Sequence, residues 1–405
     1  MIGGRGYAAP ETLKTYLRAK ALFDDWTEPA QKFAVLYGLW ANYYVGGEVA
    51  KQRASAAEFL AEAERHRVPS AVCLSHRTVG TTYVSMGEFE SGRRHLEQAR
   101  ALYEQGFESA QMYYYGQDVG STTLCYLCWA LWQIGRVDEA ADVAARAVKL
   151  AESLSHPFTL AYVICHAEGM MDVMRRRPEG VDAYAQTVIS LCSEHGYPFW
   201  GAGGQILHGW ATAHDDPEKG IELIRAGLAA WRKTGARLWL PIFVALEGEA
   251  HAAAGRSDAA LQAVDQAIAI SAETGERWAI AEVLRLKAQI LSKSGRGEAD
   301  EVEALLHQSL DAARLQGSRS WQLRTACDLV QFQRRRRGEQ DALKLLRSVY
   351  RQFSEGFGTP DLIAAKALLE GAPVQGKRGR KAKTAAASSG THRTIERSGK
   401  PRARS

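Results

Sequence analysis

Hydrophobic positions along the chain come in blocks of helical length, separated by turns that contain glycine or proline. In most of these turns a glycine is followed by a charged residue. The turns are Gly47-Glu48, Gly87-Glu88, Gly135-Arg136, Gly255-Arg256, Gly295-Arg296 and Gly338-Glu339. The glycines are 40, 48, 120, 40 and 43 residues apart, and two proline turns, Arg177-Pro178 and Asp216-Pro217, divide the gap of 120. A period near 40 residues predicts an array of structural repeats.

Tryptophans follow the same period. Trp200, Trp239, Trp278 and Trp321 are 39, 39 and 43 residues apart, and each lies near the start of the first helix of a repeat. At this spacing we interpret them as core between units; the alternative is a groove in which they stack on a ligand.

Small residues stand at fixed offsets from the turn glycines. Gly80, Cys128, Gly248 and Ala288 each come seven residues before one. Two antiparallel helices about 8–10 Å apart need small side chains where their axes approach. The succession of Gly80, Tyr83, Gly87 and Gly92 resembles the tetratricopeptide pattern of two helices per unit, with a longer period than the usual 34 residues.

The pattern therefore predicts an all-α, tetratricopeptide-like α-solenoid of about eight helix pairs in a right-handed superhelix. We expect first helices near 29–45, 69–85, 117–134, 157–175, 198–213, 237–254, 277–293 and 319–335. We expect second helices near 48–66, 88–104, 137–154, 178–195, 217–234, 257–274, 299–316 and 339–354. One more helix is expected near 11–25, and a closing helix near 360–370, with Thr359 as its N-cap. Stacked pairs would form one continuous concave surface that suits binding better than catalysis.

Charge divides the chain into two parts. The net charge is +5, but residues 372–405 carry ten Lys and Arg against the single acidic Glu396, so the remainder has a balance of −4. We expect an N-terminal extension over 1–10, a repeat domain over 11–371 and a disordered basic tail over 372–405.

Composition favours a cytoplasmic protein. The six cysteines lie dispersed in apolar helical stretches, which suits a reducing compartment better than a disulfide framework. The first residues have no apolar signal core, and the longest apolar run, Leu124 to Ile134, is too short to span a membrane.

Residues with reactive side chains do not form a recognisable catalytic, cofactor or metal motif. Cys125 and Cys128 form a lone Cys-x-x-Cys, which we interpret as buried small residues of a helix rather than a metal or redox site. The histidines, which include His66, His76, His208 and His214, make no His-Glu-x-x-His pattern. Two arginine runs, 175–177 and 334–337, are interpreted as solvated helix ends rather than nucleic-acid patches. We expect no enzyme activity and no cofactor.

The stretch Phe353-Ser354-Glu355-Gly356-Phe357-Gly358-Thr359-Pro360-Asp361-Leu362 is the most specific one in the chain. With shorter stretches such as Thr274-Gly275-Glu276-Arg277-Trp278, it resembles the C-terminal repeat region of bacterial class III adenylate/guanylate cyclases that carry a predicted AAA-type ATPase domain. The resemblance covers roughly residues 5–370. In that family the catalytic domains precede the repeats, and the chain holds no counterpart and no Gly-x-x-x-x-Gly-Lys-Ser/Thr loop. The resemblance implies a regulatory or sensing array, freestanding or separated from a catalytic partner.

Three functions remain open at this point. The first is a non-catalytic scaffold or sensor whose concave face binds a protein, a peptide or a small effector. The second is a regulatory fragment that acts with a separate cyclase/ATPase chain. The third is a DNA-associated regulator that uses the tail.

The tail predicts weak, salt-sensitive binding to polyanions. The candidate residues are Lys377, Arg378, Arg380, Lys381 and Lys383, and Arg-Gly-Arg at their centre resembles part of an AT-hook without its following proline. Removing residues 372–405 should abolish salt-sensitive DNA retention on a gel or column. Unchanged retention would exclude the tail as its cause.

Overall fold

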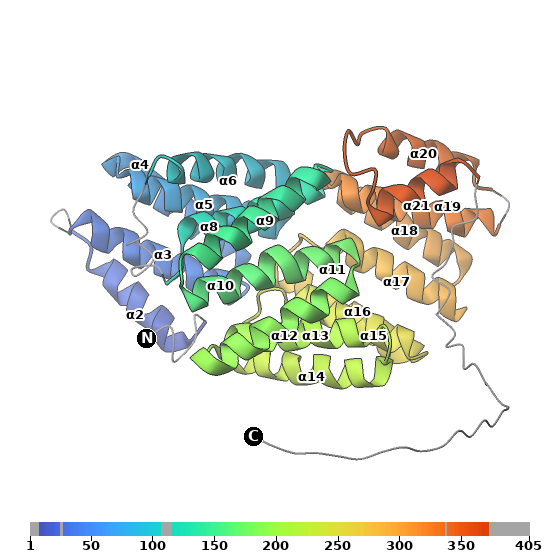
Figure 1. The fold of residues 1–405 in the computed structure, drawn as a ribbon, viewed down its shortest axis with the longest axis horizontal. Helices are drawn as coiled ribbons and strands as arrows, with labels where there is room; N and C mark the ends of the chain where they lie inside the picture. The colour runs from blue at the N-terminus through green and yellow to red at the C-terminus, as the bar shows by residue number, and fades with distance from the viewer. Residues whose placement is uncertain (1–7, 25–26, 107–115, 337, 372–405) are drawn as a thin grey trace, which may run out of the picture.

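Helices make up the fold, and they are joined by short turns. The computed structural model describes residues 8–24, 27–106, 116–336 and 338–371, and in these ranges it contains no β-strand (Figure 1). Helices follow one another as antiparallel pairs that wind into a right-handed superhelix. The predicted tetratricopeptide-like α-solenoid is confirmed.

Eight helix pairs, units 1 to 8, occupy the described ranges. The first helices are α3 (Pro29–Val45), α5 (Pro69–Met86), α8 (Val119–Gln133), a continuous rod of α10 (Pro157–Val163), η2 (Ile164–Met170) and α11 (Met171–Arg175), then α13 (Pro198–Thr212), α15 (Leu240–Ala253), α17 (Ile280–Ser294) and α19 (Arg319–Arg334). The second helices are α4 (Val49–His66), α6 (Phe89–Tyr103), α9 (Val137–Ser153), α12 (Pro178–His195), α14 (Pro217–Lys233), α16 (Ser257–Thr274), α18 (Ala299–Leu315) and α20 (Gln340–Tyr350). Helices α2 (Pro10–Ala21) and α21 (Pro360–Leu369) flank the pairs.

Several local features differ from the expectation, and α2, for example, ends at Ala21 where an end near 25 was expected. The first helix of unit 4 contains a π-helical segment, η2, where a regular helix was expected. Six of its seven residues are buried, so no alternation of polar and apolar positions could reveal the change of period. Helix α20 ends at Tyr350, four residues early. Thr359 is the N-cap of α21 as expected, but its side chain does not cap the helix and instead donates to the Gly356 carbonyl (2.7 Å).

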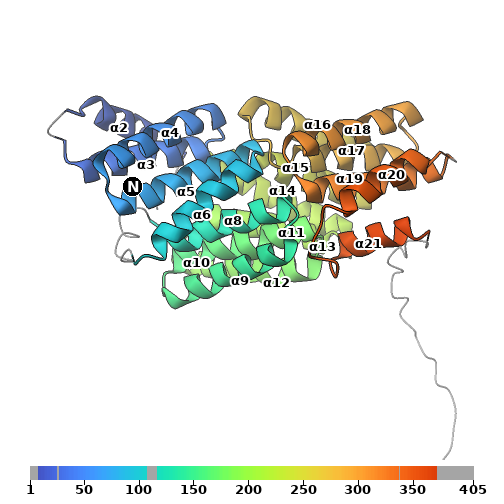
Figure 2. The ribbon, with the colours of Figure 1, turned by 90° about the horizontal axis from the view of Figure 1, so that it is seen from above.

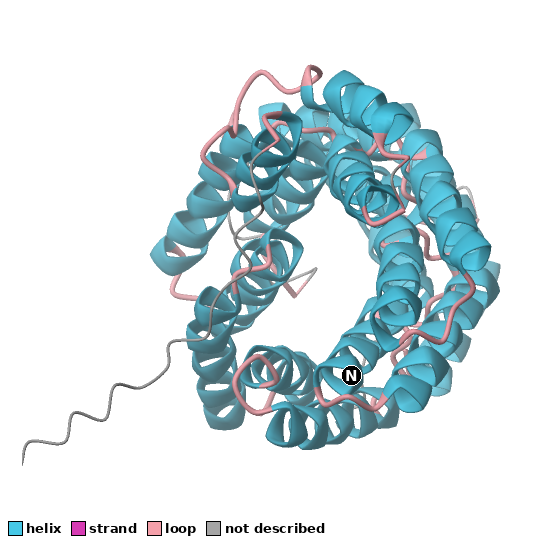
Figure 3. Ribbon diagram, turned by 90° about the vertical axis from the view of Figure 1, so that its right-hand side faces the viewer, coloured by secondary structure: helices cyan, strands magenta, loops and turns pink. Residues whose placement is uncertain are grey.

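The two helices of a pair occupy different layers. In α8, 14 of 15 residues are buried, whereas in α9 six of 17 are. A helix that is buried on all sides must be covered all round, so the first helices form the inner layer and the second helices the outer one. Figure 3, which looks along the long axis, shows the helices arranged as a ring.

One superhelical turn takes about five units, and successive turns touch. The residues just before α15 donate to the end of α3: Arg237 N and Leu238 N both bond the Val45 carbonyl, at 2.9 and 3.1 Å. One unit further on, Arg277 N and Trp278 N bond the Ser85 carbonyl at the end of α5, at 2.8 and 3.2 Å.

The contact recurs once more, between units 3 and 8. At the end of α8, the Gln133 side chain and the Trp132 carbonyl accept hydrogen bonds from Ser318 and Ser320. We call this line of contacts between units 1–3 and units 6–8 the inter-turn seam. In Figure 2, α3, α4 and α5 of units 1 and 2 lie at the left, α16 to α20 lie at the right, and α8 of unit 3 lies near the middle.

Turn glycines serve both the local fold and the seam. Gly47 has φ +69°, in the left-handed region that favours glycine, and a Cβ there would lie 2.8 Å from the Arg237 Cβ across the seam. Gly255 has a similar φ of +75°, but nothing lies within 4 Å of its Cβ position. Both positions thus need glycine for its positive φ, but only Gly47 also needs glycine because there is no space for a side chain.

We predict that Gly47→Ala destabilises the protein more than Gly255→Ala. Both variants incur left-handed backbone strain of about 1 kcal/mol. Gly47→Ala adds overpacking against the Arg237 Cβ, which typically costs about 1–3 kcal/mol. Urea unfolding of the two variants measures the difference. Equal losses of stability would show that the turns are not in tight contact at this point.

Candidate functional site

Aromatic side chains fill the interior where the turns meet. The ring centroid of Trp129 lies 5.3 Å from that of Trp239 and 5.0 Å from that of Trp278, and Trp132 lies 4.8 Å from Trp321. All five indoles are at most 3% exposed. The interpretation of the periodic tryptophans as core is confirmed, and the core they form joins distant turns as well as neighbouring units.

A histidine completes this core in neutral form. His166, in η2, is fully buried; its Nδ1 donates to the Tyr162 carbonyl (2.8 Å), and its Nε2 pairs with the Tyr126 hydroxyl (3.0 Å). Burial lowers the pKa of His166 well below its usual value.

Arg77 is a buried cation on the inner layer. It is 1% exposed, its Nη2 donates to the Tyr162 hydroxyl (3.2 Å), and its guanidinium lies 5.0 Å from the Trp40 ring. Its Nε and Nη1 have no hydrogen-bond partner, and no carboxylate of the described residues forms an ion pair with it. Cation–π contact is thus a principal compensation for its burial.

Glu276 is a buried carboxyl at the middle of the seam. Its two oxygens accept from Trp278 Nε1 (2.7 Å) and from the Trp239 amide (3.0 Å). Burial raises the pKa of Glu276 to about 7, although both hydrogen bonds favour the charged form. Near neutral pH this carboxyl can therefore be either protonated or charged.

These contacts change the picture of the concave surface. The inner layer exists as predicted, but where units 1–3 face units 6–8 its side chains are buried against each other. Two clefts open along the seam in the part of the chain that the structure describes.

The first cleft lies between unit 1 and the start of unit 6. It has a volume of about 560 Å³, and its wall includes Asn42, Lys51, Arg237 and Glu273. We call it the N-terminal cleft. Its size falls in the range of small-ligand and peptide side-chain pockets, roughly 300–1,000 Å³.

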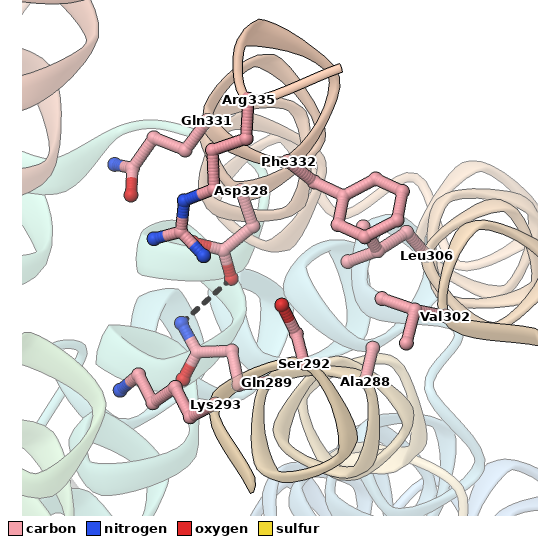
Figure 4. A pocket seen from close by; sticks show the side chains of 10 residues that line it. All are labelled: Ala288, Gln289, Ser292, Lys293, Val302, Leu306, Asp328, Gln331, Phe332 and Arg335. Carbon is pink, nitrogen blue, oxygen red and sulfur yellow. Dashed lines mark hydrogen bonds between the residues drawn. The ribbon is translucent and has the colours of Figure 1, made fainter. Parts of the chain in front are cut away.

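The second cleft lies at the other end of the seam, with a volume of about 380 Å³. One wall is Phe353–Leu362, the stretch that carries the family resemblance, which we call the clasp. We call this second cleft the clasp cleft. By contrast, the hollow between α17, α18 and α19 in Figure 4, where Gln289 Nε2 donates to Asp328 Oδ2 (2.8 Å), has a volume of about 50 Å³ and is too small for such a ligand.

The clasp binds unit 8 back onto unit 3. The Glu355 carboxylate accepts from the backbone amides of Asp138 (3.0 Å) and Glu139 (3.2 Å) at the start of α9, and Gly356 N donates to Asp138 Oδ2 (2.8 Å). A residue 217 positions away thus caps the N-terminus of α9. In Figure 1 the N-terminal end of α9 lies next to α18 and α21.

Arg324 joins four elements beside the clasp. It bonds Asp361 of α21 (2.5 Å), Glu282 of α17 (3.1 Å) and the Met174 carbonyl of α11 (2.7 Å). Its guanidinium also lies 5.7 Å from the ring of Trp132 in α8. Because each partner comes from a different element, this side chain ties the last units to units 3 and 4.

Arginines 175–177 lie at the end of the first helix of unit 4, as expected, but of the three only Arg177 is exposed to solvent. Arg176 is ion-paired with Glu249 and lies 5.5 Å from the Trp210 ring. Arg175 and Arg177 line the clasp cleft, each approaching Asp172 at 3.7 and 3.8 Å. In the second run, Arg334 pairs with Glu339 (2.5 Å), while residue 337 lies outside the described residues.

The cysteines singled out from the sequence are buried in the core, and each of the histidines singled out has a hydrogen-bond partner. Cys125 and Cys128 are fully buried on one helix, and burial raises the pKa of Cys128 to about 12 and that of Cys125 well above its usual value. Each of the four histidines has a local partner: His66 with Glu62, His76 with His95, His208 with Asp182 and His214 with the Trp210 carbonyl. Over the described ranges, no group of three or more His, Cys, Asp and Glu side chains is arranged to hold a metal ion.

The predicted polyanion-binding residues, Lys377, Arg378, Arg380, Lys381 and Lys383, lie outside the described residues, as does the whole of 372–405. Arg77, Glu276 and Arg324 were missed. Their signal in the sequence is a charged residue inside an otherwise apolar first helix, or beside a periodic tryptophan. Of the helices described, none is both long and apolar enough to cross a membrane.

Comparisons with known proteins support the fold. No family model matches the chain. An uncharacterized protein of Rhizobium meliloti (strain 1021) is 22% identical over 294 residues, which cover 72% of this chain. The chain spans 28% of that relative's length.

Two solved structures share the architecture. A Rap protein complexed with competence and sporulation factor has a TM-score of 0.50 at 12% identity, over 85% of this chain and 98% of that one. The Rap conjugation gene regulator of plasmid pLS20, in complex with the Phr* peptide, has a TM-score of 0.51 at 11% identity, over 79% and 94%. At such identities the likeness shows a tetratricopeptide-like helical repeat fold.

We predict that Glu276→Gln becomes more stabilising as the pH rises. The folded state favours the protonated carboxyl, a contribution that is present below the unfolded pKa of 4.5 and lost as the pH rises through about 7. The neutral amide does not incur this loss. Relative to the parent protein, the variant should therefore gain on the order of 2 kcal/mol between about pH 5 and pH 8. Urea unfolding at both pH values measures it, with the exposed Glu222→Gln as control. A gain that is the same at both pH values would contradict a raised pKa.

Proposed function

We propose that this chain is a non-catalytic regulatory scaffold that binds a peptide or protein partner at the inter-turn seam. The observation that carries the proposal is the position of the two clefts. Both lie where a unit of the first superhelical turn meets the unit five places later. A partner held there contacts both turns at once.

The fold likeness supports this role. The two Rap structures are complexes with competence and sporulation factor and with the Phr* peptide, so a superhelix of this architecture can hold a peptide. In this chain the buried contacts between Trp129, Trp239 and Trp278 occupy the middle of the concave face. We therefore assign partner binding to the clefts at the ends of the seam. Binding of the partner on the open part of the concave face is the alternative.

A selection experiment tests the proposal. Random 12-residue peptides displayed on phage are panned on the purified chain, and enriched peptides are measured against three variants. Lys51→Glu changes the N-terminal cleft, Ala141→Tyr fills the clasp cleft, and Arg232→Gln changes an exposed site on α14 as control. We expect at least a tenfold loss of affinity in one cleft variant and none in the control. Enriched peptides that bind all three variants equally, or no enrichment, would refute the proposal.

A second candidate is a regulatory region that works with a catalytic cyclase/ATPase chain. It rests on the resemblance of the clasp stretch, and the greater length of the Rhizobium relative is consistent with a larger assembly. Turnover of ATP and GTP by a co-expressed cyclase, with and without this chain, is its measurement; unchanged turnover would count against it. The division into 1–10, 11–371 and 372–405, a cytoplasmic location and DNA binding by the tail stay predictions.

A further inference from the structure

We propose that the clasp cleft binds a small carboxylate with an apolar body, and that Arg175 and Arg177 hold its charge. This goes beyond the scaffold role, since it assigns a small-molecule effector site to one end of the seam. Three features of the cleft carry the inference: its charge, its apolar wall and its position.

Two arginines of the cleft make only long contacts to a carboxylate. Arg175 and Arg177 share the single carboxylate of Asp172, at 3.7 and 3.8 Å, and neither contact is a close hydrogen bond. The two carboxylates of the wall are already occupied, because Asp138 accepts from Gly356 N and Asp361 accepts from Arg324. Of these two charges Arg324 balances that of Asp361, and Arg175 and Arg177 remain available as guanidinium donors for a carboxylate ligand.

Much of the remaining lining of the cleft is apolar. Trp132, Val137, Leu323, Phe353 and Leu362 line it, and all five are at most 6% exposed, so they are held in place by the core. A cleft of about 380 Å³ with an apolar wall and two convergent charges matches small ligands at the lower end of the usual range.

The position of the cleft makes a ligand there an inter-turn bridge. Val137 and Arg175 belong to units 3 and 4, whereas Leu323 and Phe353 belong to unit 8 and the clasp. A ligand that contacts both sides binds the closed superhelix better than any state in which the clasp has left α9. By linkage it must stabilise the closed state.

The test compares 1-naphthoate with its neutral amide, 1-naphthamide, by isothermal titration calorimetry on the full chain. The parent protein should bind the carboxylate about tenfold more tightly than the amide, the ratio expected from one charge-assisted pair of about 1.4 kcal/mol. The double variant Arg175→Gln/Arg177→Gln should lose this preference, and the matched control Arg232→Gln/Lys233→Gln on α14 should keep it. The double variant's circular dichroism and unfolding midpoint verify that it is folded.

Hydrogen exchange gives a second readout that is independent of affinity. Saturating 1-naphthoate should slow hydrogen exchange of the Asp138 and Glu139 amides, which donate hydrogen bonds to the Glu355 carboxylate of the clasp. Equal binding of acid and amide, a preference that survives in the double variant, or no binding of either compound up to millimolar concentration would each overturn the proposal. None of these results bears on peptide capture at the N-terminal cleft, so the scaffold proposal is tested separately.

Discussion

The contact between successive superhelical turns is the constraint on which the rest of the structure depends. Stacking on its neighbours buries the two faces of a helix pair that meet the adjacent units. In this chain the C-terminal end of each first helix in units 1–3 is also covered, by the loop that precedes the first helix five units later. The array therefore gains long-range contacts that a purely nearest-neighbour solenoid lacks, and we expect units 1 and 8 to unfold together rather than fray independently.

This constraint explains the composition of the inner layer. Because α8 is covered by α9 on one side and by units 6–8 on another, it is buried almost all round. The same closure traps charged side chains. Arg77, Glu276 and Arg324 are each nine-tenths or more buried, and their burial is compensated by aromatic rings, by two accepted hydrogen bonds with a raised pKa, and by a four-partner network, respectively.

Most of the helix boundaries could be predicted from the sequence because turn glycines and N-terminal prolines are local signals. The burial of the tryptophans could be predicted as well, since their period matches that of the turns. The seam could not. Its hydrogen bonds join residues such as Gln133 and Ser318, which are 185 positions apart, and no local pattern specifies the curvature that brings them together. The stretch Phe353–Leu362 stood out from its resemblance, but its role as a cap for α9 depends on that same curvature.

Closure also decides where regulation can act. A partner that binds one unit from outside contacts the same surface whether or not the turns touch, so it has no leverage on the equilibrium between the two states. A ligand in either cleft does, because half of its contacts vanish when the turns separate. The clasp is the most economical point for such leverage. It ends the chain of units, its main attachment to unit 3 is a small set of hydrogen bonds from Glu355 and Gly356, and Arg324 connects it directly to the buried core. Through Asp361 in its wall, the cleft is thus joined to the Arg324 side chain, which contacts α8, α11 and α17.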